Sequence, residues 1–181
     1  MGFSIRKTWV KDDRGATAVE FAMVAMPVVY LLLGIIEMSM MFVGMSTLDH
    51  ATSEAARLIK TGQVQQTKGD PEQMFKDALC DSARVFLECS KIQYEVVHLN
   101  GFSDFSNHAA SYDEDGNLDS EGFDAGSVND VVLIRAAYQY ELMTPLIAEF
   151  MSDGEGNSKR FISTIVLETE PYDVELVVDE L

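Results

Sequence analysis

The sequence is short of positive charge. Its 181 residues include 13 Lys and Arg against 30 Asp and Glu, which gives a formal net charge of −17. Such a chain repels the phosphates of nucleic acids and anionic lipid headgroups, so we predict no nucleic-acid partner. The mean hydropathy is nevertheless +0.02. A strongly acidic soluble protein would score well below zero, so this average indicates two unlike parts.

The motifs of common enzyme classes are also missing. The sequence contains no Gly-x-Ser-x-Gly nucleophile elbow, no His-Glu-x-x-His metal motif, no phosphate-binding loop and no dinucleotide fingerprint. The three histidines, His50, His98 and His108, are scattered, and none accompanies a nucleophile with an orienting partner. We therefore predict a non-enzymatic protein that uses no cofactor.

Charged residues are nearly absent from a long stretch near the N-terminus. Residues 21–36 carry none, and residues 21–48 carry only Glu37. As an α-helix these stretches span about 24 Å and about 42 Å, which bracket the hydrocarbon core of a bilayer, about 30 Å thick. The apolar residues surround the helix, whereas a soluble core helix shows a stripe. We predict one transmembrane helix, kinked or locally unwound near residues 23–27 because Pro27 removes a backbone hydrogen bond.

The flanks of this helix predict its orientation. Arg6, Lys7, Lys11 and Arg14 precede it, so the N-terminus should stay in the cytoplasm. The apolar region is too long for a cleaved secretory signal, and no good small-residue cleavage site follows it. The predicted organisation is a basic cytoplasmic leader at 1–15, a transmembrane helix at 16–48 and a periplasmic domain at 49–181 with an acidic loop at 101–130.

The junction of leader and helix carries the most specific motif. The leader ends in Gly15, and Glu20 and Phe21 follow at the fifth and sixth positions after it. This resembles the processing site of type IV prepilins, where a membrane peptidase cuts after the glycine. Cleavage here would make Ala16 the new N-terminus. A carboxylate at the bilayer edge usually has a partner, and the freed amine of a neighbouring subunit could serve. Alternatively, Glu20 sits at headgroup depth and favours the helix N-terminus.

The resemblance extends beyond this junction. Residues 14–57 look like the TadE-like family, and later stretches around Arg135, Thr144-Pro145 and Glu170-Pro171-Tyr172 are similar to its C-terminal landmarks. Residues 173–181 extend past the expected end. Family members are minor pilins or pseudopilins of the tight-adherence (Tad, Flp-type) pilus system. The resemblance implies an inner-membrane subunit whose partners are a prepilin peptidase, other pilin or pseudopilin subunits and the pilus assembly machinery.

Small residues along the predicted helix would let neighbouring helices approach closely. Glu37 is the second carboxylate in this region, and we expect it at the interface between bilayer and water on the side away from the cytoplasm. The ordinary composition of transmembrane helices explains the small residues equally well. The small residues are Ala18, Ala22, Ala25, Gly34 and Gly44.

The remainder of the chain predicts an α+β domain. Helical spacing of apolar residues from Met45 to Ile59 extends the first helix until Gly62 stops it. A second helix begins at Asp70-Pro71, and its apolar face runs from Phe75 to Phe86. Residues rich in β-branched and aromatic side chains predict strands of an antiparallel sheet at 92–99, 131–140 and 161–168. A fourth strand at 172–178, a short helix after Thr144 and a turn at 153–157 are further predictions.

Cys80 and Cys89 are the only cysteines. An even count in a non-cytoplasmic domain predicts one disulfide. A metal pair or redox dithiol would use two-residue spacing or further Cys and His nearby. Nine helical residues would separate the Cα atoms by about 13.5 Å, twice what a disulfide tolerates, so the second helix should end before Cys89.

The acidic loop contains a weak calcium candidate. Oxygen ligands alternate at Asp113, Asp115, Asn117 and Asp119. An EF-hand would need glycine at its sixth position, where Leu118 stands. A turn in a solvated loop explains the same residues, so we predict no metal. The competing function is an uncleaved, membrane-anchored ligand- or calcium-binding module.

Overall fold

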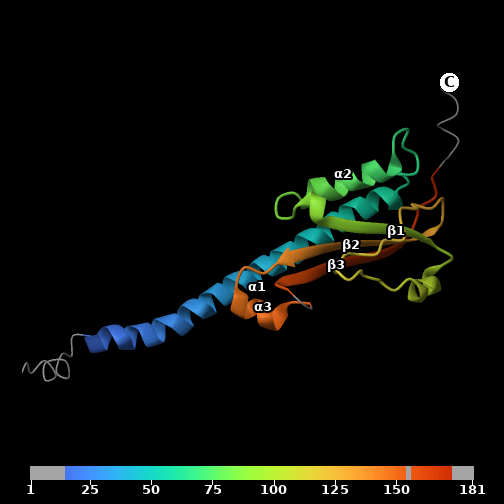
Figure 1. Cartoon of the computed structure of the whole chain (residues 1–181). Helices are drawn as coiled ribbons and strands as arrows, with labels where there is room; N and C mark the ends of the chain where they lie inside the picture. Colours follow the sequence, from blue (N-terminus) through green and yellow to red (C-terminus); the bar gives the residue numbers. More distant parts are fainter. Residues whose placement is uncertain (1–14, 154–155, 173–181) are drawn as a thin grey trace, which may run out of the picture.

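The computed structural model describes residues 15–153 and 156–172. It confirms the predicted α+β class, with a long apolar N-terminal helix followed by a small domain with a three-stranded antiparallel sheet (Figure 1). We call residues 61–172 the body. The elements in chain order are α1 (Ala16–Lys60), α2 (Pro71–Ala83), η3 (Cys89–Lys91), β1 (Ile92–Leu99), η4 (Phe102–Asn107), β2 (Val131–Glu141), α3 (Pro145–Met151) and β3 (Ser158–Glu168).

Helix α1 has two halves with different surroundings. In the free half, residues 16–33, every residue is exposed except the half-buried Ala25. In the packed half, residues 34–60, a stripe with three- and four-residue spacing is buried against the body. This stripe consists of Glu37, Met41, Gly44, Leu48, Ala51, Thr52, Ala55, Ala56 and Ile59. Packing against the body thus begins well before residue 48.

The ends of the helices follow the sequence signals. Helix α1 stops where Gly62 adopts a φ of 73°, and the Gly62 and Gln63 amides bond to carbonyls of its last turn. Helix α2 starts after Asp70, whose carboxylate accepts bonds from the Glu72 and Gln73 amides. Helix α1 also continues through Pro27, so of the predicted kink or unwinding the helix shows no unwinding there.

The sheet has the order β1-β2-β3 with β2 in the centre. Val132, Ile134 and Ala136 of β2 belong to the main core, which includes buried residues of α1 and α2. Alternate residues of β2, among them Leu133, point to the opposite face, where they form a second cluster with Leu99. Figure 1 shows α1 and α2 on one side of the sheet and the segment between β1 and β2 on the other. Burial on both faces explains the nearly continuous apolar run of β2.

Two residues of the predicted apolar helical patterns are solvent-exposed. Met45 of α1 is 52% exposed, because the buried stripe passes through Gly44 and Leu48 instead. Phe86 is 49% exposed, because α2 ends at Ala83 and the following turn carries the side chain off the helical face. The predicted strand at 172–178 lies outside the described residues after Tyr172, as does part of the predicted turn at 153–157.

Candidate membrane anchor and assembly surfaces

The prepilin-like junction lies at the exposed start of α1. Gly15 is the residue before the helix, and Ala16 is its first residue. Glu20 and Phe21 follow within the first two turns, and Phe21 is 74% exposed. Within the described residues, α1 is long and apolar enough to cross a membrane, so it is a candidate membrane anchor. The motif is therefore accessible to an enzyme or to another subunit.

The small residues of α1 fall into two groups. Ala18 and Ala22 are exposed on the free half, and Ala25 is half-buried. The two glycines instead face this chain's own body. A Cβ at Gly44 would lie 2.9 Å from Cε2 of Phe161, and a Cβ at Gly34 would lie 3.2 Å from Cδ1 of Ile147. The glycines therefore permit close approach within the subunit, whereas the alanines remain available to a neighbour.

Glu37 joins α1 to the start of α3. Its side chain is 2% exposed, because this chain's own body encloses it. The carboxylate accepts bonds from the Met143 amide at 3.1 Å, the Thr144 amide at 3.1 Å and the Thr144 hydroxyl at 3.0 Å. Burial, and next the charge of Glu37, raise the pKa of Tyr140 nearby. A carboxylate at a helix N-terminus satisfies amides that lack helical partners. Glu37 thus holds α3 against the anchor helix.

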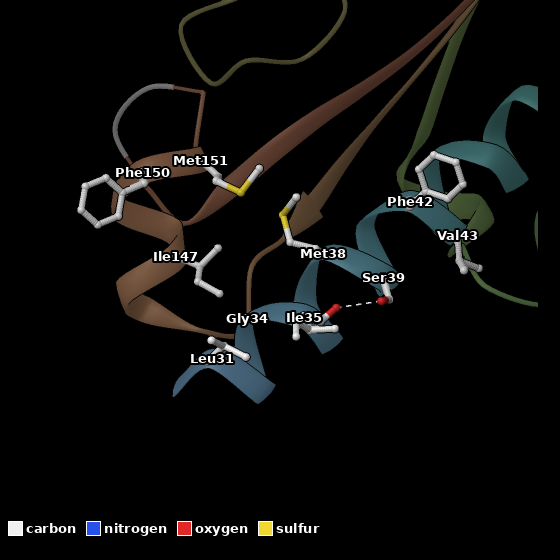
Figure 2. Close-up of a pocket in the computed structure, with 10 residues that line it drawn as sticks. All are labelled: Leu31, Gly34, Ile35, Met38, Ser39, Phe42, Val43, Ile147, Phe150 and Met151. Atoms are coloured by element: carbon white, nitrogen blue, oxygen red, sulfur yellow. Dashed lines mark hydrogen bonds between the residues drawn. The ribbon is translucent and has the colours of Figure 1, made fainter. Parts of the chain in front are cut away.

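An apolar groove runs between α1 and α3 (Figure 2). It encloses about 730 Å³, and Phe42 of α1 and Phe150 of α3 lie at opposite sides of it. The one hydroxyl shown there, that of Ser39, donates to the Ile35 carbonyl of its own helix at 2.7 Å. A second groove of about 860 Å³ lies beside Glu37 and is lined by the free half of α1 and by Met143. These grooves offer apolar contact and little polar chemistry.

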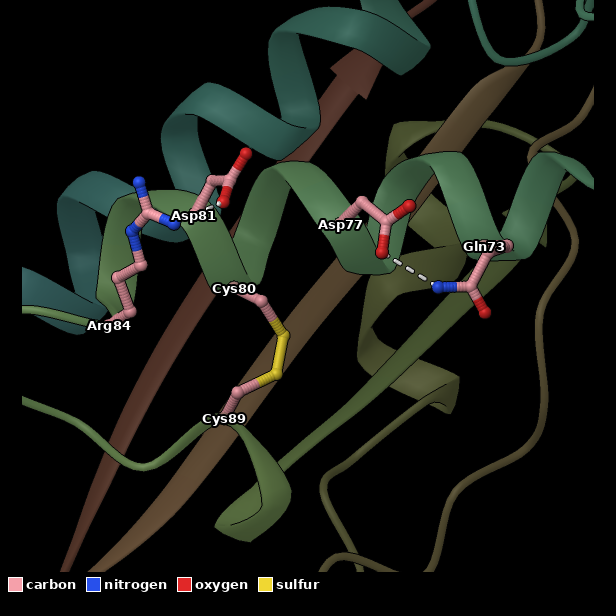
Figure 3. Close-up of a disulfide and its surroundings, with 6 residues drawn as sticks. All are labelled: Gln73, Asp77, Cys80, Asp81, Arg84 and Cys89. Carbon is pink, nitrogen blue, oxygen red and sulfur yellow. Dashed lines mark hydrogen bonds and ion pairs between the residues drawn. A yellow bond between two sulfur atoms is a disulfide. The ribbon is translucent and has the colours of Figure 1, made fainter.

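The disulfide ties the end of α2 to the start of the sheet. Cys80 in the last turn of α2 is bonded to Cys89 at the start of η3, with their Cα atoms 5.3 Å apart (Figure 3). As the geometry required, α2 ends before Cys89. Beside it, Gln73 donates to Asp77, and Arg84 pairs with Asp81 at 3.3 Å. The crosslink closes the turn that leads to β1.

A buried ion pair occupies the sheet face opposite the helices. Arg135 of β2 pairs with Glu95, its direct cross-strand partner on β1, and their side chains are 4% and 2% exposed. Each residue also binds the segment between the strands. Arg135 donates to the His108 carbonyl at 2.8 Å, and Glu95 accepts from the Glu121 amide at 3.1 Å. The pair therefore fastens this segment to the sheet. The pair was not predicted, although Arg135 inside the apolar run of β2 is a signal of it in the sequence.

The acidic loop is bound to the sheet at several points, while most of its residues are exposed to solvent, as predicted. Leu118 is 8% exposed, and its amide donates to Gln93 of β1 at 2.6 Å. Gln139 of β2 donates to the Asp115 carbonyl at 3.0 Å. Polar side chains on this face of the sheet thus bind the main chain of the loop.

The calcium candidate residues form a turn. The Asp113 carboxylate accepts bonds from the amide and side chain of Asn117, while Gly116 between them has a φ of 81°. The Arg160 guanidinium donates to the Gly116 carbonyl at 3.1 Å, so a cation already lies beside the loop. Asp119 instead accepts a bond from Ser111. Among the described residues, no group of three His, Cys, Asp or Glu side chains could hold a metal ion.

The three histidines stay apart. His98 lies 3.6 Å from Asp130, His108 bonds to Glu121 at 3.0 Å, and His50 is exposed on α1. The partners of His98 and His108 are carboxylates of the acidic loop, at the surface of the body.

The fold and its surfaces define an α+β domain carried on one long apolar helix. Comparison with family models places the N-terminal segment more specifically: residues 15–57 match the model of the family described as TadE-like protein. The match confirms the family resemblance over nearly all of α1, including the Gly15 to Glu20 junction. The same comparisons found no match among curated proteins and none among solved structures.

Proposed function

We propose that this protein is a TadE-like minor pilin or pseudopilin, a structural subunit for assembly of a Tad (Flp-type IV) pilus. The observation that supports the proposal is the family match over residues 15–57, a stretch that includes Gly15, Glu20 and the exposed start of α1. The role is non-enzymatic: the body is carried on a helix whose free half packs first with lipid and then with other subunits. The partners are a prepilin peptidase, other pilin or pseudopilin subunits and the assembly machinery.

The exposed chemistry of the free half supports subunit packing. Its large apolar side chains face outward, among them Leu31 and Leu32, which are 61% and 53% exposed. Ala18 and Ala22 leave room for a neighbouring helix. After cleavage between Gly15 and Ala16, the Glu20 carboxylate is positioned for the free amine of a neighbour. Ion pairing then compensates the cost of a carboxylate among apolar helices.

The proposed location is the inner membrane, with a cytoplasmic leader at 1–15 and the body in the periplasm. The basic leader supports this orientation through the bias of Lys and Arg toward the cytoplasmic side. The disulfide supports it as well, because such bonds persist in oxidising compartments.

The decisive experiment is to determine the N-terminus of the protein purified from membranes of cells that contain a prepilin peptidase. Mass spectrometry should find Ala16 as the first residue. A Gly15→Val variant should retain the leader, and Glu20→Ala should be processed but should impair assembly. A wild-type protein that keeps Met1 would overturn the proposal and favour an uncleaved membrane-anchored binding module.

A further inference from the structure

Helix α3 is the apolar element that the body presents beside the anchor helix. In Figure 1 it lies alongside α1 at the end of the body nearest the N-terminus. Two large apolar side chains here are highly exposed: Phe150 on the helix is 81% exposed, and Met143, just before the helix, is 68% exposed. Large apolar side chains are unfavourable in water, so we expect lipid or another protein surface to cover them.

The length of the anchor helix indicates what covers them. Residues 16–36 of α1 span about 31 Å as a helix, close to the hydrocarbon thickness of about 30 Å. The outer boundary of the bilayer then falls at Glu37, the residue that binds the start of α3. The apolar surface of α3 is therefore continuous with the surface of α1 that faces lipid.

The backbone of this region is suited to an environment with little water. The Met143 and Thr144 amides donate to Glu37, and Pro145 has no amide hydrogen. The Ile147 and Ala148 amides both donate to the Thr144 carbonyl. Bilayers require such internal satisfaction, because lipid offers no partners to an exposed amide. The side chain of Glu37 is itself buried, so lipid does not meet its charge.

We infer that α3 is an interfacial membrane helix: Phe150 and Met143 insert into the outer leaflet, and the body rests on the bilayer through this helix. This inference rests on α1 being the membrane anchor, as proposed above. Glu149 of α3 is exposed next to Phe150, so the helix lies at headgroup depth with its apolar side chains pointing toward the acyl region. The membrane-spanning part of α1 then ends at residue 36 instead of residue 48.

Depth-dependent fluorescence quenching tests this placement in the full-length chain. The sequence has one tryptophan, Trp9, so the background is Trp9→Phe, produced without a prepilin peptidase. Single tryptophans are introduced by Phe150→Trp and, as an independent second position, Met143→Trp. Tyr30→Trp in the free half reports insertion of the anchor, and Phe102→Trp, 58% exposed on η4, reports the distal part of the body. The probes are phosphatidylcholine vesicles with bromine at shallow or deep acyl positions.

Tryptophan at 150 and 143 should be quenched several-fold more than tryptophan at 102, and more by shallow than by deep bromines. Tryptophan at 30 should be quenched most by deep bromines. If tryptophan at position 30 is quenched while tryptophan at 150 and 143 is quenched no more than at 102, the inference about α3 is overturned, although α1 is still inserted in the membrane. A blue-shifted but unquenched emission at 150 also overturns it, because a second copy or another protein then covers α3. Absence of quenching at 30 overturns the anchor itself.

Discussion

The two halves of α1 differ in composition and in surroundings, because the free half carries one charged residue and the packed half carries five. The free half leaves nearly all of its side chains exposed, whereas the packed half buries one stripe against α2 and the sheet. Glu20 is the only carboxylate of the free half, and Glu37 is the buried one among the three carboxylates of the packed half. Glu20 is exposed, but Glu37 has all its described bonds with its own chain. One helix thus packs within the chain along one half and stays exposed along the other.

The largest loss of stability should come from breaking the ion pair between Arg135 and Glu95 in the body. Arg135→Met leaves the buried Glu95 carboxylate uncompensated, so the free energy of unfolding should fall by about 3–5 kcal/mol. Near-UV circular dichroism during urea titration of the protein in detergent measures this loss. Replacing both residues, Glu95→Leu with Arg135→Met, should recover most of it. Lys91→Met, which removes an exposed pair with Glu141, is the matched control and should cost less than about 1 kcal/mol.

The disulfide should stabilise the body and leave the free half of α1 unaffected. Replacing both Cys80 and Cys89 by Ser should lower the free energy of unfolding of the body by about 2–3 kcal/mol, because the crosslink restricts the unfolded chain. The helicity of the free half in detergent should stay unchanged. Urea titration with and without reductant provides the comparison. Equal stability under both conditions would show that the crosslink is absent or contributes nothing.

The two glycines of the packed half should respond differently to alanine. Gly44→Ala drives a Cβ against the Phe161 ring and should destabilise the docking of α1 by about 1–3 kcal/mol. Gly34→Ala meets only the flexible end of Ile147, so it should be neutral or stabilise by up to about 1 kcal/mol through helix propensity. Thermal unfolding of the two variants side by side tests this difference. A larger loss for Gly34→Ala would contradict the packing described.

Replacing Glu37 should affect the stability of the body, whereas replacing Glu20 should affect assembly with other subunits. Glu37→Gln keeps the shape but replaces charged hydrogen bonds by neutral ones, which should cost about 1 kcal/mol locally. Hydrogen exchange at the Met143 and Thr144 amides should then be faster, by about fivefold. Glu20→Gln should leave exchange in the body unchanged and reduce co-purification with other pilin subunits. Faster exchange in α3 for Glu20→Gln would remove the distinction between the two halves.

The smallest effect is expected in the acidic loop at low pH. Hydrogen bonds from the Asn117 side chain and amide lower the pKa of Asp113 below its ordinary value of 3.8. Because the folded pKa is the lower one, the stabilisation is complete above about pH 4 and is lost as the pH falls through the folded value. Carboxyl titration by NMR should show this, and Asp113→Asn should remove the local pH dependence. A titration at or above 3.8 would contradict the turn.

Local signals in the sequence predicted the elements well. Asp70 followed by Pro71 marked the start of α2, and Gly62 marked the end of α1. These features depend on interactions within a few residues, which the sequence displays directly. Runs of β-branched residues likewise predicted the strands, although β3 begins at Ser158, before the predicted residue 161.

Contacts between distant segments were not predictable in the same way. Nothing near Glu37 shows that its partners lie at Met143 and Thr144, which are more than a hundred residues away. The acidic loop also has the composition of a solvated segment. Its order depends on polar side chains of two strands, among them Gln93 and Gln139, and their pairing exists only in the folded sheet.

The unbroken course of α1 makes the molecule a lever. Its 45 helical residues form a rod about 67 Å long. Because the body is packed along residues 34–60 of that rod, it turns with the rod as one piece. A tilt of about 10° at the N-terminal end displaces the far end by roughly 12 Å, so a small change in the direction of the free half becomes a large movement of the distal part of the body.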